Sequence, residues 1–240
     1  AFVARRTHTA LLSVGLGFSA GVMVYVSFME LFPSGLATIQ KFYPGQQGQF
    51  LGIGAFFGGM VVFGIIDRLL PEPVNPHEAH RVEEMRESNN HHKLQRMGIF
   101  TALAVGIHNF PEGMATFVGG LQDPEIGMAI AGAVALHNIP EGIAVAVPLY
   151  FATGSRIKAF KYSFLSGLAE PVGALVGYLV LRPWLDGAGL GVIFAAIAGI
   201  MVAISLDELL PAAREYGQPH KAMYGMAAGM VVMAVGLVFL

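Results

Sequence analysis

The sequence contains no cysteine, and charged residues make up only 12% of its 240 positions. The lack of cysteine excludes disulfides and thiolate metal sites, so a soft ion such as Cu(I) would find none of its preferred ligands. Soluble domains carry about 25% charged residues, whereas 55% of this chain is hydrophobic. The composition therefore predicts an integral membrane protein whose surroundings are a lipid bilayer, with no nucleic-acid partner.

Seven apolar segments are long enough to cross a bilayer, which takes about 20 residues at a rise of about 1.5 Å each. The segments cover residues 10–37, 48–70, 95–121, 125–151, 157–182, 188–212 and 220–240. We therefore expect an all-α transmembrane helix bundle that forms one domain over residues 1–240. The polar segment 71–94 is the long connection of the chain, and we expect it to be a flexible loop that holds four histidines.

Basic residues collect on one side of the membrane in this arrangement. Of the 14 Lys and Arg residues, all but Lys41 and Arg182 fall on the side that holds the start of the chain and the 71–94 segment. Cytoplasmic loops carry an excess of positive charge. That side is therefore predicted to be cytoplasmic, with the C-terminus outside the cell.

Two stretches of the sequence repeat one another. Ala20–Pro33 and Ala198–Pro211 share Ala, Gly, Met, Ser, Glu, Leu and Pro at one constant offset, and Gly59–Val62 more weakly resembles Gly229–Val232. The first span would run outward and the sixth inward, which predicts an inverted repeat, as in secondary transporters with sites near the membrane midplane. The fifth span has no counterpart, so we expect a further helix before residue 1. The complete protein would then have eight spans in a 3+2+3 arrangement and both termini outside.

A six-residue phrase occurs in the third span and again in the fourth. In each copy a His and a Glu lie four residues apart and share one helix face, with an Asn beside them. Ionisable groups inside a bilayer cost several kcal/mol unless they are paired or bound to an ion. The two spans are antiparallel, so equivalent donors are expected to meet at one depth, which Glu170 of the fifth span also reaches. The predicted metal ligands are His108, Asn109, Glu112, His137, Asn138, Glu141 and Glu170.

Nitrogen and oxygen donors without thiolate suit Zn, Fe(II), Mn, Co or Cd. The donors outnumber the four of a tetrahedral zinc site, so two adjacent metals bridged by Glu112 and Glu141 are one alternative. A single intramembrane His or Pro more often serves packing, and it is the duplication of the phrase that favours ligation. These features predict a permease for divalent metal ions. The rival functions are an intramembrane metal-dependent hydrolase, whose zinc would activate water, and a metal sensor without flux.

Other acidic and histidine residues are candidate gate or secondary metal ligands. Glu30 and the Asp207–Glu208 pair occupy symmetric positions, either as entrance and exit carboxylates or as caps of helices that end at proline. The histidines of the 71–94 segment could hold metal weakly on the cytoplasmic side or could simply be solvated. They are His77, His80, His91 and His92.

The two phrases, Glu170 and the Asp207–Pro211 run resemble the ZIP (Zrt/Irt-like protein) family of metal permeases, most closely its bacterial ZupT-like branch. The resemblance implies eight spans, external termini, a homodimer and a place in the bacterial inner membrane. It also implies uptake of zinc, iron(II) and other divalent ions into the cytoplasm through a binuclear site, with no cofactor beyond the transported ions. By position, the first metal would match His108, Glu112, His137 and Glu141. The second would match Asn109, Glu112, Asn138, Glu141 and Glu170.

Overall fold

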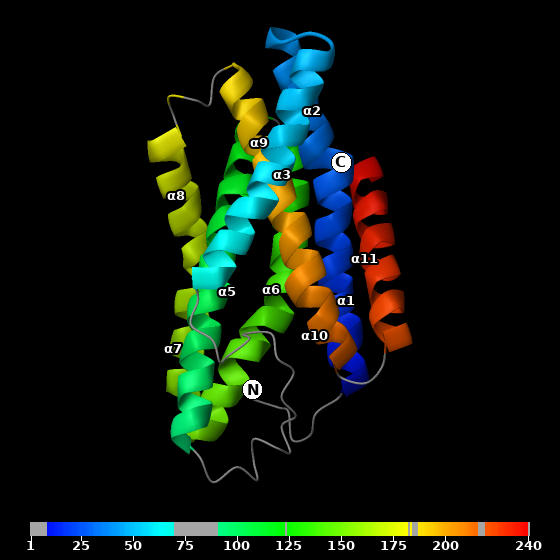
Figure 1. The fold of residues 1–240 in the computed structure, drawn as a ribbon. Helices are drawn as coiled ribbons and strands as arrows, with labels where there is room; N and C mark the ends of the chain where they lie inside the picture. Colours follow the sequence, from blue (N-terminus) through cyan, green and yellow to red (C-terminus); the bar gives the residue numbers. More distant parts are fainter. Residues whose placement is uncertain are drawn as a thin grey trace.

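The computed structural model describes residues 9–69, 91–122, 124–181, 183, 187–215 and 219–239. Within these ranges the regular structure is entirely helical (Figure 1). Among the described residues, five segments are long and apolar enough to cross a membrane: Ser13–Phe42, Gln46–Arg68, Arg156–Val180, Ala188–Arg214 and Pro219–Val238. The all-α membrane bundle predicted from the composition is thus confirmed.

Each of the seven predicted spans corresponds to one helix or to a series of joined helices. The unbroken ones are α3 (Gln46–Leu69), α5 (His91–Gln122), α6 (Pro124–Thr153) and α11 (Pro219–Phe239). The first span consists of α1 (Thr9–Val26), the π turn η1 (Ser27–Leu31) and α2 (Phe32–Phe42). The sixth span has the same order of elements: α9 (Ala188–Ile204), the π turn η3 (Ser205–Leu209) and α10 (Leu210–Glu215). The fifth is divided into α7 (Arg156–Gly167) and α8 (Ala169–Leu181).

Two of these boundaries differ from the prediction. Helix α5 begins at His91, so the last four residues of the segment assigned to a loop form a helical turn, and residues 71–90 lie outside the described part of the chain. The fifth span is interrupted at Leu168, whose amide still donates to the Phe164 carbonyl at 2.9 Å. Pro171 has no amide hydrogen to donate to the carbonyl four residues earlier, at Gly167. The helix therefore restarts at this point.

Close approach of backbones through glycine holds two helix pairs together. Helix α1 packs against α11, and α9 packs against α3 (Figure 1). A Cβ atom on Gly21 would overlap the backbone carbonyl of Met226 in the first pair, and one on Gly199 would overlap that of Phe56 in the second. Gly21 and Gly199 are equivalent residues of the two repeated stretches, so the repeat in the sequence corresponds to a repeat in the packing. These glycines pack helices within one chain.

Both repeated stretches contain a π turn at the same place. In η1 the Phe32 amide donates to the Ser27 carbonyl, five residues earlier. In η3 the Leu210 amide donates to the Ser205 carbonyl. The matching turns extend the internal symmetry from the sequence to the hydrogen bonds. Neither turn is predicted from the sequence.

Serine and proline account for the position of these turns. Ser27 donates its hydroxyl to the carbonyl four residues earlier at 2.7 Å, and Ser205 does the same at 2.8 Å. Pro33 and Pro211 follow each turn and cannot complete the α-helical ladder, because proline has no amide hydrogen and its ring crowds the carbonyl four residues earlier. A wider turn accommodates that mismatch without ending the helix. Such turns often occur at functional sites.

In the described part of the chain, the buried side chains form one large cluster and two smaller ones. The large cluster joins α1, α3, α9, α10 and α11, includes Met23 and Phe194, and reaches α6 at Val134. One smaller cluster joins α5, α6 and α7 through Val105, Val145 and neighbouring residues, and the other joins α5 to α6 through Leu94 and Val147. Helices α5 to α8 pack mainly on one another, and this group contacts the rest of the bundle where α6 meets α1 and α11 and where α5 meets α9. Both copies of the repeated phrase belong to this group.

Candidate metal centre

The first phrase lies on α5 and the second on α6, and these helices pack along one another. Pro111 falls inside α5, which continues through it as one helix. Three polar side chains of the phrases are almost fully buried: Asn109 is 2% exposed, Glu112 0% and Glu141 2%. Burial of such groups is costly unless they have partners. They therefore face protein, as expected for ligands.

Glu170 lies in the first turn of α8, at the point where α5, α6 and α8 meet. A Cβ atom on Gly113 would overlap the Glu170 carbonyl, so the glycine of the first phrase allows the α8 backbone to touch α5. From the second phrase, the side-chain amide of Asn138 donates a hydrogen bond to the Glu170 carboxylate. Both phrases therefore contact the same residue. These contacts put the two phrases at the level of Glu170. The helices that carry them, α5 and α6, run in opposite directions (Figure 1).

Helix α7 fixes the orientation of the first phrase and also contacts the second. The Asn109 amide nitrogen donates to the Ser166 carbonyl at 3.2 Å. The Ser163 hydroxyl donates to the Gly142 carbonyl of α6 at 3.2 Å. Ser163 and Ser166 are not among the residues predicted from the sequence, although two serines three residues apart in a membrane helix indicate a polar face.

Two buried amide oxygens at this level are the strongest indication of a ligand. The Oδ1 atoms of Asn109 and Asn138 are buried and have no hydrogen-bond partner in the described part of the chain. Each asparagine is oriented by its amide nitrogen, which is bound to Ser166 in one case and to Glu170 in the other. Buried polar atoms are nearly always satisfied, and an unsatisfied one needs an explanation. Amide oxygens of this kind are ligands that hard and borderline cations accept, so a divalent cation is one explanation for them.

The structure assembles some of the predicted ligands and leaves others undescribed. His108 and His137 lie on α5 and α6, but their side chains are outside the described part. Among the described side chains, no group of three or more His, Asp or Glu is close enough to hold a metal. Among the predicted ligands, the structure describes one side-chain contact, the hydrogen bond from Asn138 to Glu170. Glu112, Glu141 and Glu170 all make interactions within the protein.

The candidate gate residues Glu30, Asp207 and Glu208 lie in the two π turns and not on α5, α6 or α8. Glu30 is in η1, where its carboxylate accepts the Ser34 hydroxyl at 3.3 Å. In η3, Glu208 is buried and Asp207 is exposed. These carboxylates thus belong to the two π turns, and their role as gates stays a prediction.

The loop histidines can be placed only in part. His92 is exposed in the first turn of α5, and the 16 residues that separate it from His108 correspond to about 24 Å of helix. His92 is therefore remote from the level of Glu170. His91 begins the same helix, but its side chain is not described, and His77 and His80 lie outside the described residues.

Comparison with known proteins identifies the family. Residues 67–236 match the family described as ZIP zinc transporter, a range that includes both phrases and Glu170. The chain belongs to the ZIP zinc transporter family. Membership makes this ZIP protein a transporter and argues against the metal-dependent hydrolase.

Individual ZIP relatives match nearly the whole chain. A Streptococcus mutans protein named zinc transporter ZupT is 58% identical over 237 residues, which cover 99% of this chain and 89% of the relative. Proteins of the same name from Oceanobacillus iheyensis and Campylobacter jejuni are 57% and 49% identical over 100% and 99% of this chain. They are covered to 91% and 89% of their own lengths. The resemblance predicted from the two phrases is thus confirmed.

Proposed function

We propose that this ZIP protein carries zinc and related divalent ions into the cytoplasm through the level at which α5, α6 and α8 meet. The observation that supports this most strongly is the pair of buried amide oxygens on Asn109 and Asn138, one from each phrase. The relatives are named zinc transporters. Iron(II), manganese, cobalt and cadmium share the preference of zinc for nitrogen and oxygen donors, so they are candidate substrates as well.

The number of donors favours two ions rather than one. The phrases and Glu170 bring two imidazoles, two amides and three carboxylates, whereas a tetrahedral zinc takes four ligands. In the binuclear arrangement Glu112 and Glu141 bridge the ions, the histidines complete the first and the asparagines with Glu170 complete the second. Neutral amide ligands hold a metal less tightly than thiolates, which suits release during transport.

Alternating access is the mechanism that fits the internal symmetry. Matching π turns and glycine contacts on α1 and α9 give the two halves of the bundle equivalent but oppositely directed structures. Transporters with such inverted repeats expose a central site to each side in turn. We place the protein as a homodimer in the bacterial inner membrane, with the termini of the complete protein outside.

Zinc uptake by proteoliposomes that contain the purified protein tests the proposal. Wild type should accumulate zinc, and Glu141→Gln should lower uptake more than about tenfold, because loss of even an outer contact of a metal site typically costs 10–100-fold. Glu215→Gln removes the same charge at the end of α10 and is the matched control. Zinc binding without uptake by wild type would show a sensor instead. Equal uptake by both variants would exclude the proposed site.

A further inference from the structure

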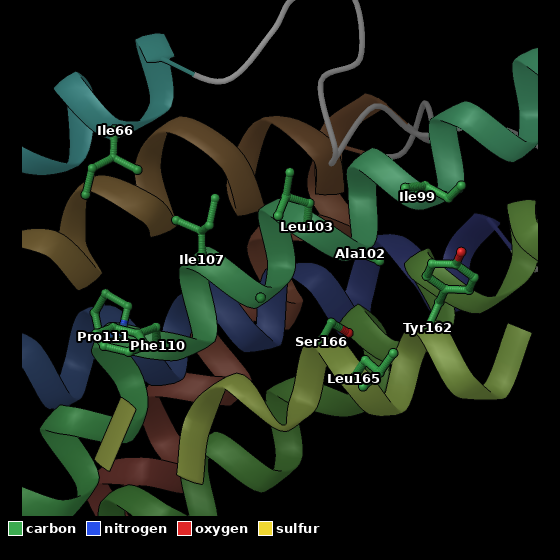
Figure 2. A pocket seen from close by; sticks show the side chains of 11 residues that line it. Ile66, Ile99, Ala102, Leu103, Ile107, Phe110, Pro111, Tyr162, Leu165 and Ser166 are labelled. Carbon is green, nitrogen blue, oxygen red and sulfur yellow. The ribbon is translucent and has the colours of Figure 1, made fainter. Parts of the chain in front are cut away.

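An apolar groove of about 630 Å³ runs along α5, between the end of α3 and α7 (Figure 2). Ile66 borders it from α3, Ile99, Leu103 and Ile107 from α5, and Leu165 from α7. Tyr162 and Ser166 are the polar side chains among its lining residues. The volume is in the range of pockets that hold small molecules, about 300–1,000 Å³. The lining suits a hydrocarbon chain.

Cationic side chains surround one end of this groove. Arg96 lies three residues before Ile99, and Lys158 and Lys161 lie four residues before Tyr162 and Leu165. At these spacings each cation is on the same helix face as a lining residue and one turn nearer the start of α5 or α7. All three are exposed. Figure 2 shows Ile99 and Tyr162 together at this end of the groove, with Ile66 and Pro111 at the other.

The charges near the groove are predominantly positive. Arg68 is exposed two residues beyond Ile66, and the acidic residue beside it, Asp67, is half-buried and already engaged within the protein. The Arg96 guanidinium lies over the Phe100 ring, 5.4 Å from its centroid. Stacking of this kind holds the guanidinium in place while its edge remains able to donate to an anion.

We propose that the groove binds an anionic phospholipid, with an acyl chain along α5 and the phosphate held by Arg96, Lys158 and Lys161. The bilayer supplies acyl chains wherever a membrane protein has an apolar groove, and basic pockets between membrane helices bind acidic headgroups. Tyr162 fits the same arrangement, because tyrosine prefers the headgroup level of a membrane. The apolar lining accounts for the chain and the cations account for the preference for an anionic head.

The bound lipid would lie directly behind the metal centre. Ser166 lines the groove with its side chain, and its carbonyl accepts the Asn109 amide at 3.2 Å. Phe110 also lines the groove. A Cβ atom on Gly173 of α8 would overlap the backbone carbonyl of Phe110, so α8 touches α5 at this residue. An acyl chain would therefore pack against the same α5–α7 contact that orients a proposed metal ligand. The lipid site does not depend on the proposed metal transport and can be tested without it.

Native mass spectrometry of the delipidated full chain, titrated with phosphatidylglycerol or phosphatidylcholine, tests the site. Wild type should retain phosphatidylglycerol in preference. Lys161→Gln should weaken retention about fivefold, the effect expected for one cation near an acidic headgroup. Lys221→Gln removes an exposed charge at the start of α11, away from the groove, and should leave retention unchanged. Equal retention of the two lipids, or equal effects of the two substitutions, would overturn the proposal.

A second variant tests the hydrocarbon part without touching the charges. Leu103 is 50% exposed in the groove, so Leu103→Trp should fill it and leave the fold intact. Retention of phosphatidylglycerol should then fall although all the cations remain, whereas Val231→Trp, at an exposed position of α11, should have no effect. Soluble glycerol phosphate should not compete. Competition by glycerol phosphate would show a site for anions alone and would overturn the lipid site. In a separate variant, Leu103→Cys, disulfide formation between two chains would show that a second copy covers the groove, which would also overturn it.

Discussion

The side-chain amide of Asn138 donates a hydrogen bond to the carboxylate of Glu170 and so joins α6 to α8. Gly113 of α5 touches the backbone of the same glutamate. One residue is therefore shared by both copies of the repeated phrase, although Glu170 belongs to neither. In the proposed metal centre, this shared contact is what brings two phrases on separate helices to one ion.

Asn138→Ala should weaken zinc binding and uptake by about 10–100-fold, because it removes one donor and releases Glu170 from its orientation. Isothermal titration calorimetry and proteoliposome uptake measure the two effects. Ile139→Ala is the matched control, since Ile139 is the next residue and is 61% exposed. Similar losses in both variants would mean that α6 is sensitive to any truncation, and that the Asn138–Glu170 contact has no particular role.

Gly113→Ala should separate α5 from α8, since the added Cβ would overlap the Glu170 carbonyl. Overpacking of this kind costs about 1–3 kcal/mol of stability, so the melting temperature of the detergent-solubilised protein should fall together with zinc uptake. At Gly132 of α6 the structure describes no atom within 4 Å of an added Cβ, and Gly132→Ala should be tolerated. A Gly113→Ala variant that melts like wild type would show that α5 and α8 do not touch at this glycine.

Much of the fold follows from the sequence. The helix ends lie within a few residues of the seven predicted spans, because length and hydrophobicity decide which segments cross a bilayer. The fifth span breaks at Leu168, where Pro171 cannot donate to the Gly167 carbonyl. Helix α5 also contains a proline, Pro111, but continues through it unbroken. Whether a proline ends a membrane helix depends on which neighbouring groups satisfy the freed carbonyl. The sequence of a single helix does not contain that information.

The candidate site is predictable to a similar degree. Asn109, Asn138 and Glu170 could be selected as candidates because a duplicated set of polar residues is costly inside a membrane, and their binding of metal stays a prediction. Ser163 and Ser166 could not, because their contacts are made partly by backbone carbonyls. A backbone acceptor is present at every residue, so only the fold shows which one is used.

Pro33→Ala and Pro211→Ala should each slow zinc uptake while leaving zinc affinity unchanged. Either substitution restores an amide donor and removes the reason for the nearby π turn, which makes a continuous α-helix more stable. The two effects should be similar in size, since the turns are equivalent in the repeat. Pro219 is the first residue of α11, a position where proline is harmless, and Pro219→Ala is the control. A change in affinity in place of rate would tie the π turns to binding.

Ser163→Ala should reduce stability by about 0.5–1.5 kcal/mol, the usual net contribution of one hydrogen bond. It removes the bond from α7 to the Gly142 carbonyl of α6. In Ser166 the hydroxyl bonds only within α7, to the Ser163 carbonyl at 2.8 Å, so Ser166→Ala should cost less. Thermal unfolding in detergent compares the two variants. The opposite order would show that the hydroxyl of Ser163 does not hold α7 against α6.

The most direct test of the metal centre is anomalous diffraction at the zinc absorption edge, from crystals of the full protein grown with zinc. The account predicts one or two peaks between α5, α6 and α8, within bonding distance of the Asn109 and Asn138 amide oxygens and of Glu170. Peaks found only near Glu30 and Glu208, or only beside residues 71–90, would contradict it.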